Sequence, residues 1–449
     1  MSRQMKDSGI EWIGEIPEAW EVVRMKSCIS ARDSGAWGVE ANGEEGDAIC
    51  LRIADFDYSK FTFKNVDESE LTIRHYNMDI INKLALRKGD IVIEKSGGGE
   101  KTPVGRTVIF DKDYVALYAN FCDRLRCREI VTSKFLQYIF VTFYTNKFVW
   151  NYIKQTTGIQ NLDLTTMLAK EMVALPSLAE QERIAKFLDS QCAHIDAVIE
   201  KTKASVEEYK KLKQAVITQA VTKGVRGDRP MKDSGSIWFG EIPKDVNISR
   251  VGLHYDIILG KMVCSEPKES SMKEYPYICA ANVHFEGVDT SDLKKMWFSD
   301  TEISTYEVRN GDLLVVEGGA GAGGCAIAHD ISEKIGIQNS IQIVRPKKDD
   351  SSAYLCYLLQ ALVKQKYIDV ICNKATIPHF TKDKLATVPF IKWSYEEQCE
   401  IVAYLDKKCS EMDVLVAKKE AFLTELETYK KSLIYEYVTG KKEVPQSCQ

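Results

Sequence analysis

Two long stretches of the sequence carry an uninterrupted pattern of apolar and polar positions. Neither proline nor glycine occurs in residues 179–222 or in residues 395–438. Steps of four and three residues connect mostly apolar positions in both stretches, which is typical of a coiled-coil helix. The apolar positions of this predicted seam are Ile184, Leu188, Ile195, Val198, Tyr209, Leu212 and Val216 in the first stretch, and Ile401, Leu405, Met412, Leu415, Phe422, Leu426, Tyr429 and Leu433 in the second.

A helix of this length spans on the order of 60 Å at about 1.5 Å per residue. Two such helices in one chain can bury their seams by packing together. An antiparallel pair agrees with a two-fold relation between the halves of the chain, whereas a parallel pair does not. The alternative is two amphipathic helices that cover separate cores, but helices of ordinary globular domains rarely reach forty residues.

The rest of each half alternates short apolar runs with glycine- and aspartate-rich turns, which is typical of β-strands. The predicted strands are residues 49–53, 90–93 and 107–109 in the first half, and 312–316 and 341–344 in the second. A helix follows in each half, at 133–152 and 353–370. The fold class expected is α+β: two pseudo-symmetric α/β domains, separated by two long helices that form an antiparallel coiled coil.

The two halves repeat each other in order. Met5-Lys-Asp-Ser-Gly returns as Met231-Lys-Asp-Ser-Gly, Lys88-Gly-Asp as Asn310-Gly-Asp, and Glu180-Gln as Glu397-Gln. Internal repetition predicts two similar modules. The expected division is a globular domain at 1–177, a helix at 178–223, a second domain at 224–392, a second helix at 393–440 and a tail at 441–449. The boundary between the halves, 222–230, contains glycine, proline and charged residues without apolar periodicity.

Composition narrows the functional classes only slightly. No apolar run approaches the roughly 18 residues of a membrane helix, and no signal-peptide core is visible near the start, so a cytoplasmic protein is expected. The 13 cysteines include no Cys-x-x-Cys pair, which favours reduced thiols over a zinc site or a disulfide framework. A net charge of −5 counts weakly against a nucleic-acid partner, because such binding needs only a local basic patch.

Motifs for catalysis and cofactors are missing. An amino-methyltransferase of DNA would show Asp/Asn-Pro-Pro-aromatic, and no Pro-Pro occurs. Gly260-Lys-Met and Gly440-Lys-Lys lack the hydroxyl of a P-loop. The glycines of residues 319–324 match a dinucleotide fingerprint, but the residues that follow predict a strand instead of a helix, so a strand-to-strand loop is expected. We predict no catalytic residue, no metal site and no cofactor in this chain.

Candidate DNA-binding residues lie in glycine-rich or amide-rich segments. Cations beside glycines can approach a phosphate, and Asn or Gln can pair with adenine in the major groove. Arg124, Arg126 and Arg128 alternate along a predicted strand and would share one face. The candidates are Lys95, Lys101, Thr102, Arg106, Gln160 and Asn161 in the first half, and Lys374, Thr376 and His379 in the second. For each of them the alternative is a solvated surface side chain.

The order and duplication of these motifs resemble a known family. Trp12-x-Gly-x-Ile-Pro17 and its repeat at Trp238, Lys88-Gly-Asp, residues 157–162, and Leu175-Pro preceding Glu180-Gln-Glu-Arg-Ile occur in this order. Together they resemble the DNA-specificity subunit of type I restriction–modification systems, over almost the whole chain. The second half departs from the pattern at Thr376-Ile-Pro-His-Phe380.

The resemblance implies a non-catalytic subunit that recognises a bipartite sequence in double-stranded DNA through two target-recognition domains. Its implied partners are two methyltransferase subunits and restriction–translocation subunits, which would use S-adenosylmethionine, ATP and Mg²⁺. Two other classes remain open at this point: a self-sufficient nuclease or methyltransferase with an unrecognised site, and a coiled-coil scaffold that binds only proteins. Turnover by the isolated chain would favour the first, and salt-independent behaviour towards DNA the second.

Overall fold

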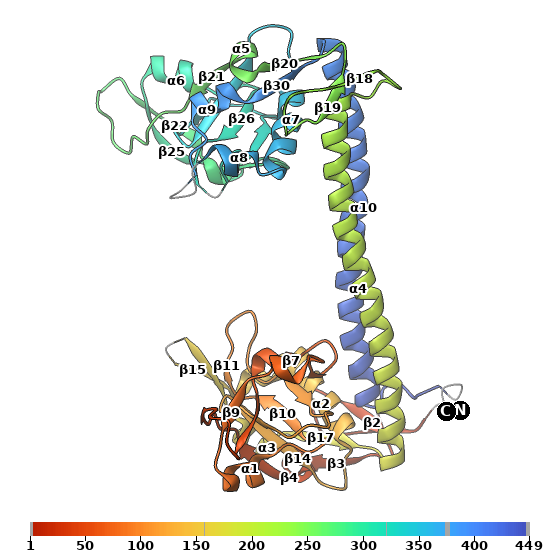
Figure 1. Ribbon diagram of the computed structural model, residues 1–449. Helices are drawn as coiled ribbons and strands as arrows, with labels where there is room; N and C mark the ends of the chain where they lie inside the picture. Colours follow the sequence, from red (N-terminus) through yellow and green to blue (C-terminus); the bar gives the residue numbers. More distant parts are fainter. Residues whose placement is uncertain (1–2, 157, 320, 373–377, 446–449) are drawn as a thin grey trace. The chain divides into compact units, whose positions relative to one another are not determined.

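The structure is a computed structural model that describes residues 1–449 except 1–2, 157, 320, 373–377 and 446–449. The chain forms two compact units. Unit 1 consists of Met1–Lys203 and Ala421–Gln449, and unit 2 is Ala204–Glu420. Each unit therefore contains one globular module, the beginning of one long helix and the end of the other (Figure 1). No helix in the described part of the chain is long and apolar enough to span a membrane.

The module of unit 1 is built on a six-stranded sheet in the order β4-β14-β10-β12-β8-β7. A four-stranded sheet, β13-β6-β9-β5, packs beside it, and α2 contributes buried aromatic rings such as Phe135 and Tyr138 to the main core. The bounds are β4 Ile29–Ser34, β14 Cys122–Cys127, β10 Ile91–Glu94, β12 Thr107–Ile109, β8 Thr62–Phe63, β7 Phe56–Asp57, β13 Ala116–Tyr118, β6 Asp47–Leu51, β9 Ile73–His75, β5 Val39–Glu40, α1 Met78–Leu84, α2 Ser133–Thr145 and α3 Leu164–Lys170.

Unit 2 repeats the central strands of this sheet. Its order β21-β29-β26-β27 corresponds to β4-β14-β10-β12, and all of these neighbours are antiparallel in both modules. A three-stranded sheet, β25-β22-β28, accompanies it. The bounds are β21 Tyr255–Leu259, β29 Ile341–Pro346, β26 Leu313–Val316, β27 Cys325–Ile327, β25 Lys294–Phe298, β22 Lys273–Ile278, β28 Gly336–Ile337, α5 Val251–His254, α6 Asp300–Tyr306, α7 Ser352–Lys364, α8 Tyr367–Ile371 and α9 Lys382–Thr387.

The repeated segments at the start of each half form matching hairpins. In unit 1, β1 (Met5–Asp7) pairs with β2 (Glu15–Pro17), and in unit 2 β18 (Met231–Asp233) pairs with β19 (Glu241–Pro243). A strand after each hairpin pairs with the strand that precedes the long helix: β3 (Glu21–Arg24) with β17 (Met172–Leu175), and β20 (Asn247–Arg250) with β30 (Pro389–Lys392). The duplication thus extends to the attachment of each module to its helix.

The helices predicted at 133–152 and 353–370 are each interrupted. Helix α2 ends at Thr145, and a short 3-10 helix at Phe148–Tyr152 follows Lys147, whose φ is 64°. Helix α7 ends at Lys364, and α8 follows Lys366, which also has a φ of 64°. A left-handed residue breaks the helical hydrogen-bond pattern without glycine or proline, so the sequence pattern did not indicate either break.

Both long helices are present, α4 at Leu178–Lys223 and α10 at Tyr395–Val438. In unit 1 the ring of Phe187 contacts that of Tyr437 at 4.6 Å between centroids, and Asp196 pairs with Lys430 at 2.7 Å. In unit 2, Lys213 pairs with Asp413 at 2.7 Å and Lys210 with Glu420 at 3.5 Å. Residue numbers rise along one helix as they fall along the other, so the predicted antiparallel pairing is confirmed within each unit.

The buried face of the two helices differs from the predicted seam at every second position. After Leu188 the buried positions are Cys192, Ile195, Ile199 and Val206, because the step from Leu188 is four residues where the prediction used three. On α10 the same shift buries Cys409 after Leu405. Cysteine, isoleucine and valine at these shifted positions bury more apolar surface than the Gln191 and Ser205 that the predicted steps would place inside.

The predicted seam residues therefore divide into three groups. Ile184, Leu188, Ile195, Ile401, Leu405 and Leu433 are buried, and Val198, Tyr209, Val216, Met412 and Leu426 are half-buried. Leu212, Leu415, Phe422 and Tyr429 instead lie on the outer side, with exposed fractions of 49%, 41%, 44% and 53%. These four were wrongly assigned to the seam by the choice of step.

Each long helix ends in the same way. Gly224 follows α4 with a φ of +77°, and Gly440 closely follows α10 with a φ of +74°. A Cβ at Gly224 would lie 3.0 Å from the Trp393 ring, and one at Gly440 would lie 2.4 Å from Pro17. Glycine is required at both positions because the left-handed turn ends the helix against a packed side chain.

Candidate nucleic-acid interface

The repeated Gly-Asp motif is an anchor at the start of a central strand. Asp90 accepts hydrogen bonds from Arg126 Nε and Nη2 at 2.8 and 2.7 Å and from the backbone N–H of Arg87 at 2.9 Å. Asp312 does the same with Arg345, at 2.7 and 2.6 Å, and with the N–H of Arg309 at 2.8 Å. Both aspartates are buried. Each motif fixes its strand, β10 or β26, and so positions the loop that follows.

The repeated Glu-Gln motif ties each long helix to its module. Gln181 is fully buried; it accepts from the N–H of Thr132 at 2.8 Å and donates to the carbonyl of Pro176 at 2.9 Å. Gln398 accepts from the N–H of Ser351 at 2.8 Å and donates to Asp350 at 2.8 Å. These glutamines satisfy backbone groups at the N-termini of α2 and α7. They are structural residues, and the same holds for both halves.

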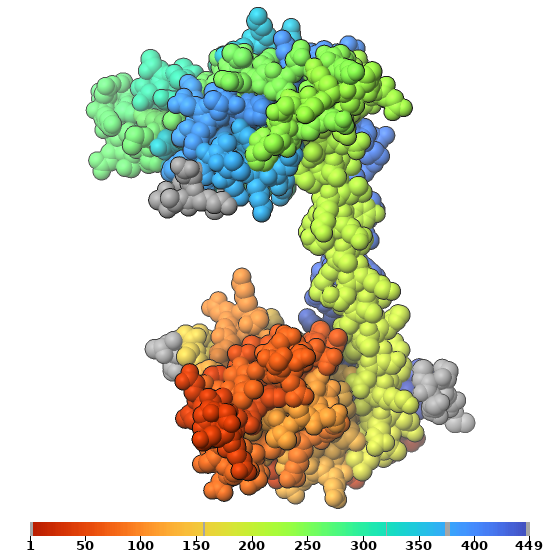
Figure 2. Space-filling view, viewed as in Figure 1, coloured from red at the N-terminus to blue at the C-terminus, as the bar shows by residue number. Residues whose placement is uncertain are grey.

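The two candidate DNA-binding segments of the first half lie together. Strand β11 (Ser96–Gly97) pairs with β16 (Ile159–Leu162), which pairs in turn with β15 (Ile153–Thr156). Ser96 donates to the side-chain oxygen of Asn161 at 2.8 Å. The loop after β10, in orange, and the β15–β16 hairpin, in yellow, project from the body of unit 1 (Figures 1 and 2). The strands β11, β16 and β15, together with the loop that follows β11 and contains Lys101 and Thr102, are called loop sheet 1 below.

Two of the predicted DNA-contacting residues in unit 1, Lys95 and Arg106, already have partners within the protein. Lys95 donates to Asp123 at 2.8 Å and to Ser34 at 2.7 Å. Arg106 forms a bidentate pair with Glu94 at 2.8 and 3.2 Å, and its guanidinium stacks 3.7 Å from the Tyr58 ring centre. Burial raises the pKa of Glu94, and Arg106 opposes that shift. These two cations therefore neutralise buried carboxylates of their own module.

Gln160 is fully buried, whereas its neighbour Asn161 is exposed. Successive side chains of a strand point to opposite faces, so the two amides cannot both face a ligand. Gln160 accepts from the N–H of Val104 at 3.3 Å. The alternating arginines are also occupied: Arg124 pairs with Asp33 at 2.5 Å, Arg126 with Asp90, and Arg128 donates to the carbonyl of Ile29 at 3.0 Å.

The remaining candidates are accessible where the structure describes them. Lys101 and Thr102 are exposed in the loop after β10, and Asn161 is exposed on β16. His379 is exposed in unit 2, where it forms an isolated bridge with Gly318. Lys374 and Thr376 lie outside the described residues. The exposed set keeps polar groups able to contact phosphates or base edges.

A basic depression in unit 1 was missed by the sequence pattern. A pocket of about 570 Å³ is lined by Arg24, Lys26, Arg32 and Arg128, together with Ser30 and Thr165. Arg32 donates to Asp123 at 2.7 Å, and so shares this carboxylate with Lys95. The four cations come from separate strands and loops, and no short motif joins them. Only the tertiary fold brings them together.

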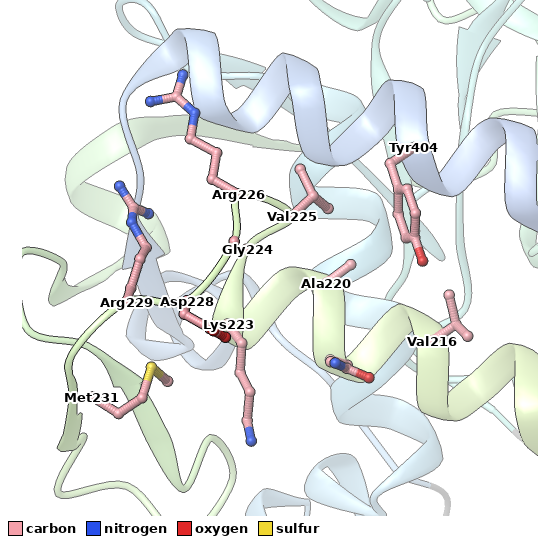
Figure 3. A pocket seen from close by; sticks show the side chains of 12 residues that line it. Val216, Ala220, Lys223, Gly224, Val225, Arg226, Asp228, Arg229, Met231 and Tyr404 are labelled. Carbon is pink, nitrogen blue, oxygen red and sulfur yellow. The ribbon is translucent and has the colours of Figure 1, made fainter.

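The boundary between the halves forms a pocket in unit 2. Its volume is about 420 Å³, and it is lined by the end of α4 (Val216, Ala220, Lys223), the linker from Gly224 to Met231, and Tyr404 of α10 (Figure 3). Arg226 pairs with Glu400 at 2.7 and 2.8 Å, and Arg229 pairs with Glu397 at 2.7 Å. These cations attach the linker to the start of α10. We therefore interpret the pocket as part of the structural connection between α4, the linker and α10.

Comparison with known proteins gives one consistent family. Residues 17–208 match the model of the type I restriction modification DNA specificity domain. A putative type I restriction enzyme MjaX specificity subunit of Methanocaldococcus jannaschii is 24% identical over 440 residues, covering 96% of this chain and 95% of that protein. The EcoKI specificity subunit of Escherichia coli K12 is 25% identical over 313 residues, 67% of this chain and 62% of that protein.

Two solved structures share the fold. A chain from a structure of type I R-M complex assembly and conformational transition has a TM-score of 0.71 at 17% identity, covering 95% of this chain and 99% of that chain. The HsdS subunit from Thermoanaerobacter tengcongensis has a TM-score of 0.53 at 17% identity, covering 95% of this chain and 98% of that chain. Both matches extend over the two modules and the two long helices.

Proposed function

The chain belongs to the specificity subunits of type I restriction–modification systems, and from this premise we propose that its two modules recognise the two halves of a split DNA sequence. It is a non-catalytic DNA-recognition subunit. The observation that carries the bipartite proposal is the duplicated scaffold, in which the same strand order and the same anchors, Asp90 and Asp312, carry loops with different exposed side chains. Matched scaffolds with diverged loops suit a target with two unlike halves.

The domain boundaries 1–177 and 224–392 remain part of this proposal, with 178–223 and 393–440 as the connecting helices and 441–449 as a tail. Loop sheet 1 would contact DNA in the first domain, through Lys101, Thr102 and Asn161. The segment around Gly318 and His379 would do so in the second. The proposed role needs no cofactor in this chain; S-adenosylmethionine, ATP and Mg²⁺ would be used by partner subunits.

Two methyltransferase subunits are the proposed partners of the long helices, and restriction subunits would join them for cleavage. Exposed apolar side chains that gather into a contiguous patch mark protein-binding surfaces. Unit 1 exposes Leu178 of α4 and Phe422 and Tyr429 of α10, and unit 2 exposes Leu212 of α4 and Tyr395, Tyr404, Val414 and Leu415 of α10. Because each unit exposes apolar side chains on its own part of the long helices, one methyltransferase subunit for each unit is the simplest stoichiometry.

Methylome sequencing of a host with and without this chain tests the proposal. We expect one methylated motif with two specific parts and a non-specific gap, present only when the chain and its partner subunits are expressed. Turnover by the purified chain alone with DNA, Mg²⁺ and S-adenosylmethionine would instead favour a self-sufficient enzyme. A methylome unchanged by the chain, together with salt-independent behaviour towards duplex DNA, would favour a protein-binding scaffold.

Replacing Lys101 by alanine is expected to weaken DNA binding uniformly across sequences. Each neutralised phosphate contributes about 0.9 to the slope of log K against log salt, so the slope should fall in magnitude by roughly that amount. The measurement is a salt titration of duplex binding by the full complex. Lys83→Ala, at an exposed lysine on α1, is the control and should leave the slope unchanged. An unaltered slope for Lys101→Ala would remove this lysine from the interface.

A further inference from the structure

Glu317 and His379 of unit 2 occupy the positions that Lys95 and Asn161 occupy in unit 1. The backbone establishes the correspondence, because the N–H of Leu162 donates to the carbonyl of Lys95 at 2.8 Å and the N–H of Phe380 donates to that of Glu317 at 2.6 Å. One residue further along the strand, Ser96 pairs with Asn161 and Gly318 pairs with His379. The two modules therefore place opposite charges at one position of the same scaffold.

In unit 1 the charge of Lys95 is neutralised by a carboxylate of the same module. The Lys95 ammonium binds Asp123, whose side chain is completely buried and also accepts from Arg32. The exposed fraction of the Lys95 side chain is 22%. Lys95 therefore has a structural role. Of the two residues Lys95 and Asn161, only Asn161 remains accessible to a ligand.

In unit 2 the other residues of this ion-pair network are replaced by uncharged residues. Asp123 lies opposite Ile93 on the neighbouring strand, and the residue in the same place opposite Val315 is Gln342. Arg32 lies opposite Leu125, and the matching residue opposite Val344 is Ile257. Gln342 is buried and donates to the carbonyl of Phe380 at 2.6 Å. Among the described residues, the Glu317 carboxylate has neither a hydrogen-bond donor nor an ion-pair partner within bonding distance.

The surroundings of Glu317 still favour contact with a ligand. Partial burial raises the pKa of its carboxyl, and the nearby His379 opposes that shift. Gly318 lies directly against His379, since a Cβ at this glycine would be 3.1 Å from His379 Nδ1. Gly319, with a φ of +90°, has open space where its Cβ would be. A backbone without side chains can approach bases closely.

A carboxylate in a DNA-facing loop is repelled by phosphates unless a base donates a hydrogen bond to it. The exocyclic amino group of cytosine, N4–H₂, is the donor with which Glu and Asp pair in the major groove. We propose that Glu317 accepts a hydrogen bond from the N4 amino group of a cytosine in the second half-site, with His379 beside it contacting the same or the adjacent base pair. This inference rests on the proposed function and assigns a base to one position of the target.

The test is methylome sequencing of a host that expresses the complete system with wild-type chain, Glu317→Gln or Glu317→Ala. The wild-type motif must contain a C·G pair in the half-site recognised by unit 2. Glu317→Ala should lose the preference for cytosine at one position of that half-site by roughly 10- to 100-fold. Glu317→Gln keeps a carbonyl acceptor but loses the charge, so its loss should be smaller, and in both variants the other half-site and the gap should stay unchanged. Glu333→Gln, at an exposed glutamate of the same module, should retain the wild-type motif.

A second measurement separates recognition from folding. Removing a negative charge that faces DNA should strengthen binding of the full complex to a duplex without the site, and weaken binding to the cognate duplex. A general loss of folding would weaken both. An unchanged motif in both variants, or parallel loss of cognate and non-cognate binding, would overturn the inference for Glu317. If the wild type itself yields no two-part motif, the proposed function fails first.

Discussion

Asp312→Ala is expected to destabilise unit 2 selectively, and Asp90→Ala unit 1. Each substitution leaves a partly buried arginine, Arg345 or Arg126, without its carboxylate, and removes the acceptor of a backbone N–H. Breaking a buried ion pair from one side costs about 3–5 kcal/mol. Because each arginine side chain is still 21–26% exposed, a loss near the lower end, about 3 kcal/mol, is expected.

Hydrogen exchange followed by mass spectrometry provides the measurement, since it reports opening segment by segment. In Asp312→Ala, faster exchange should be confined to the central strands β26 and β29. In Asp90→Ala it should be confined to β10 and β14. Asp312→Asn and Asp90→Asn retain an acceptor for the backbone N–H, so they should show smaller effects. Equal acceleration in both units after a single substitution would contradict the independence of the two modules.

The sequence predicted the long helices well because their evidence is local. Forty residues without glycine or proline, and a sustained heptad period, require no knowledge of partners. It was harder to predict which positions of the heptad pattern face the partner helix. From Leu188, a step of three reaches Gln191 and a step of four reaches Cys192, and the buried face of the antiparallel pair selects the second. Leu212 and Phe422 were consequently placed inside although they are exposed.

Charged candidates were less predictable because their partners lie far away in the sequence. Arg106 pairs with Glu94, the last residue of the preceding strand β10. Lys95 pairs with Asp123 on the neighbouring strand β14. No local pattern distinguishes such a pair from a phosphate contact. A strand prediction for residues 159–162 would have excluded one of Gln160 and Asn161, since adjacent residues of a strand face opposite sides. Gln160 shares its side of the strand with the apolar Leu162, which marks it as the inward residue. The Lys95-to-Glu317 exchange became visible only after the two modules were aligned by their backbone hydrogen bonds.

Lengthening both long helices by one heptad is expected to lengthen the preferred gap between the half-sites. We propose that α4 and α10 set the distance between the two recognition modules. A four-residue insertion, one helical turn, would already add length, but it does not restore a seam with a seven-residue period. Seven residues inserted after Lys203 and after Glu420 preserve the seam and add about 10 Å to each helix, roughly three base-pair steps of 3.4 Å.

Selection from duplexes with randomised gaps measures this effect directly. With the double insertion, the preferred gap should lengthen by about one to three base pairs, while the bases of both half-sites remain the same. Insertion into α4 alone is the matched control. It leaves seven residues without partners in α10, so it should reduce stability and produce no single longer gap. An unchanged gap in the stable double-insertion variant would show that the distance between half-sites is fixed elsewhere, and the long helices would then serve only to hold partner subunits.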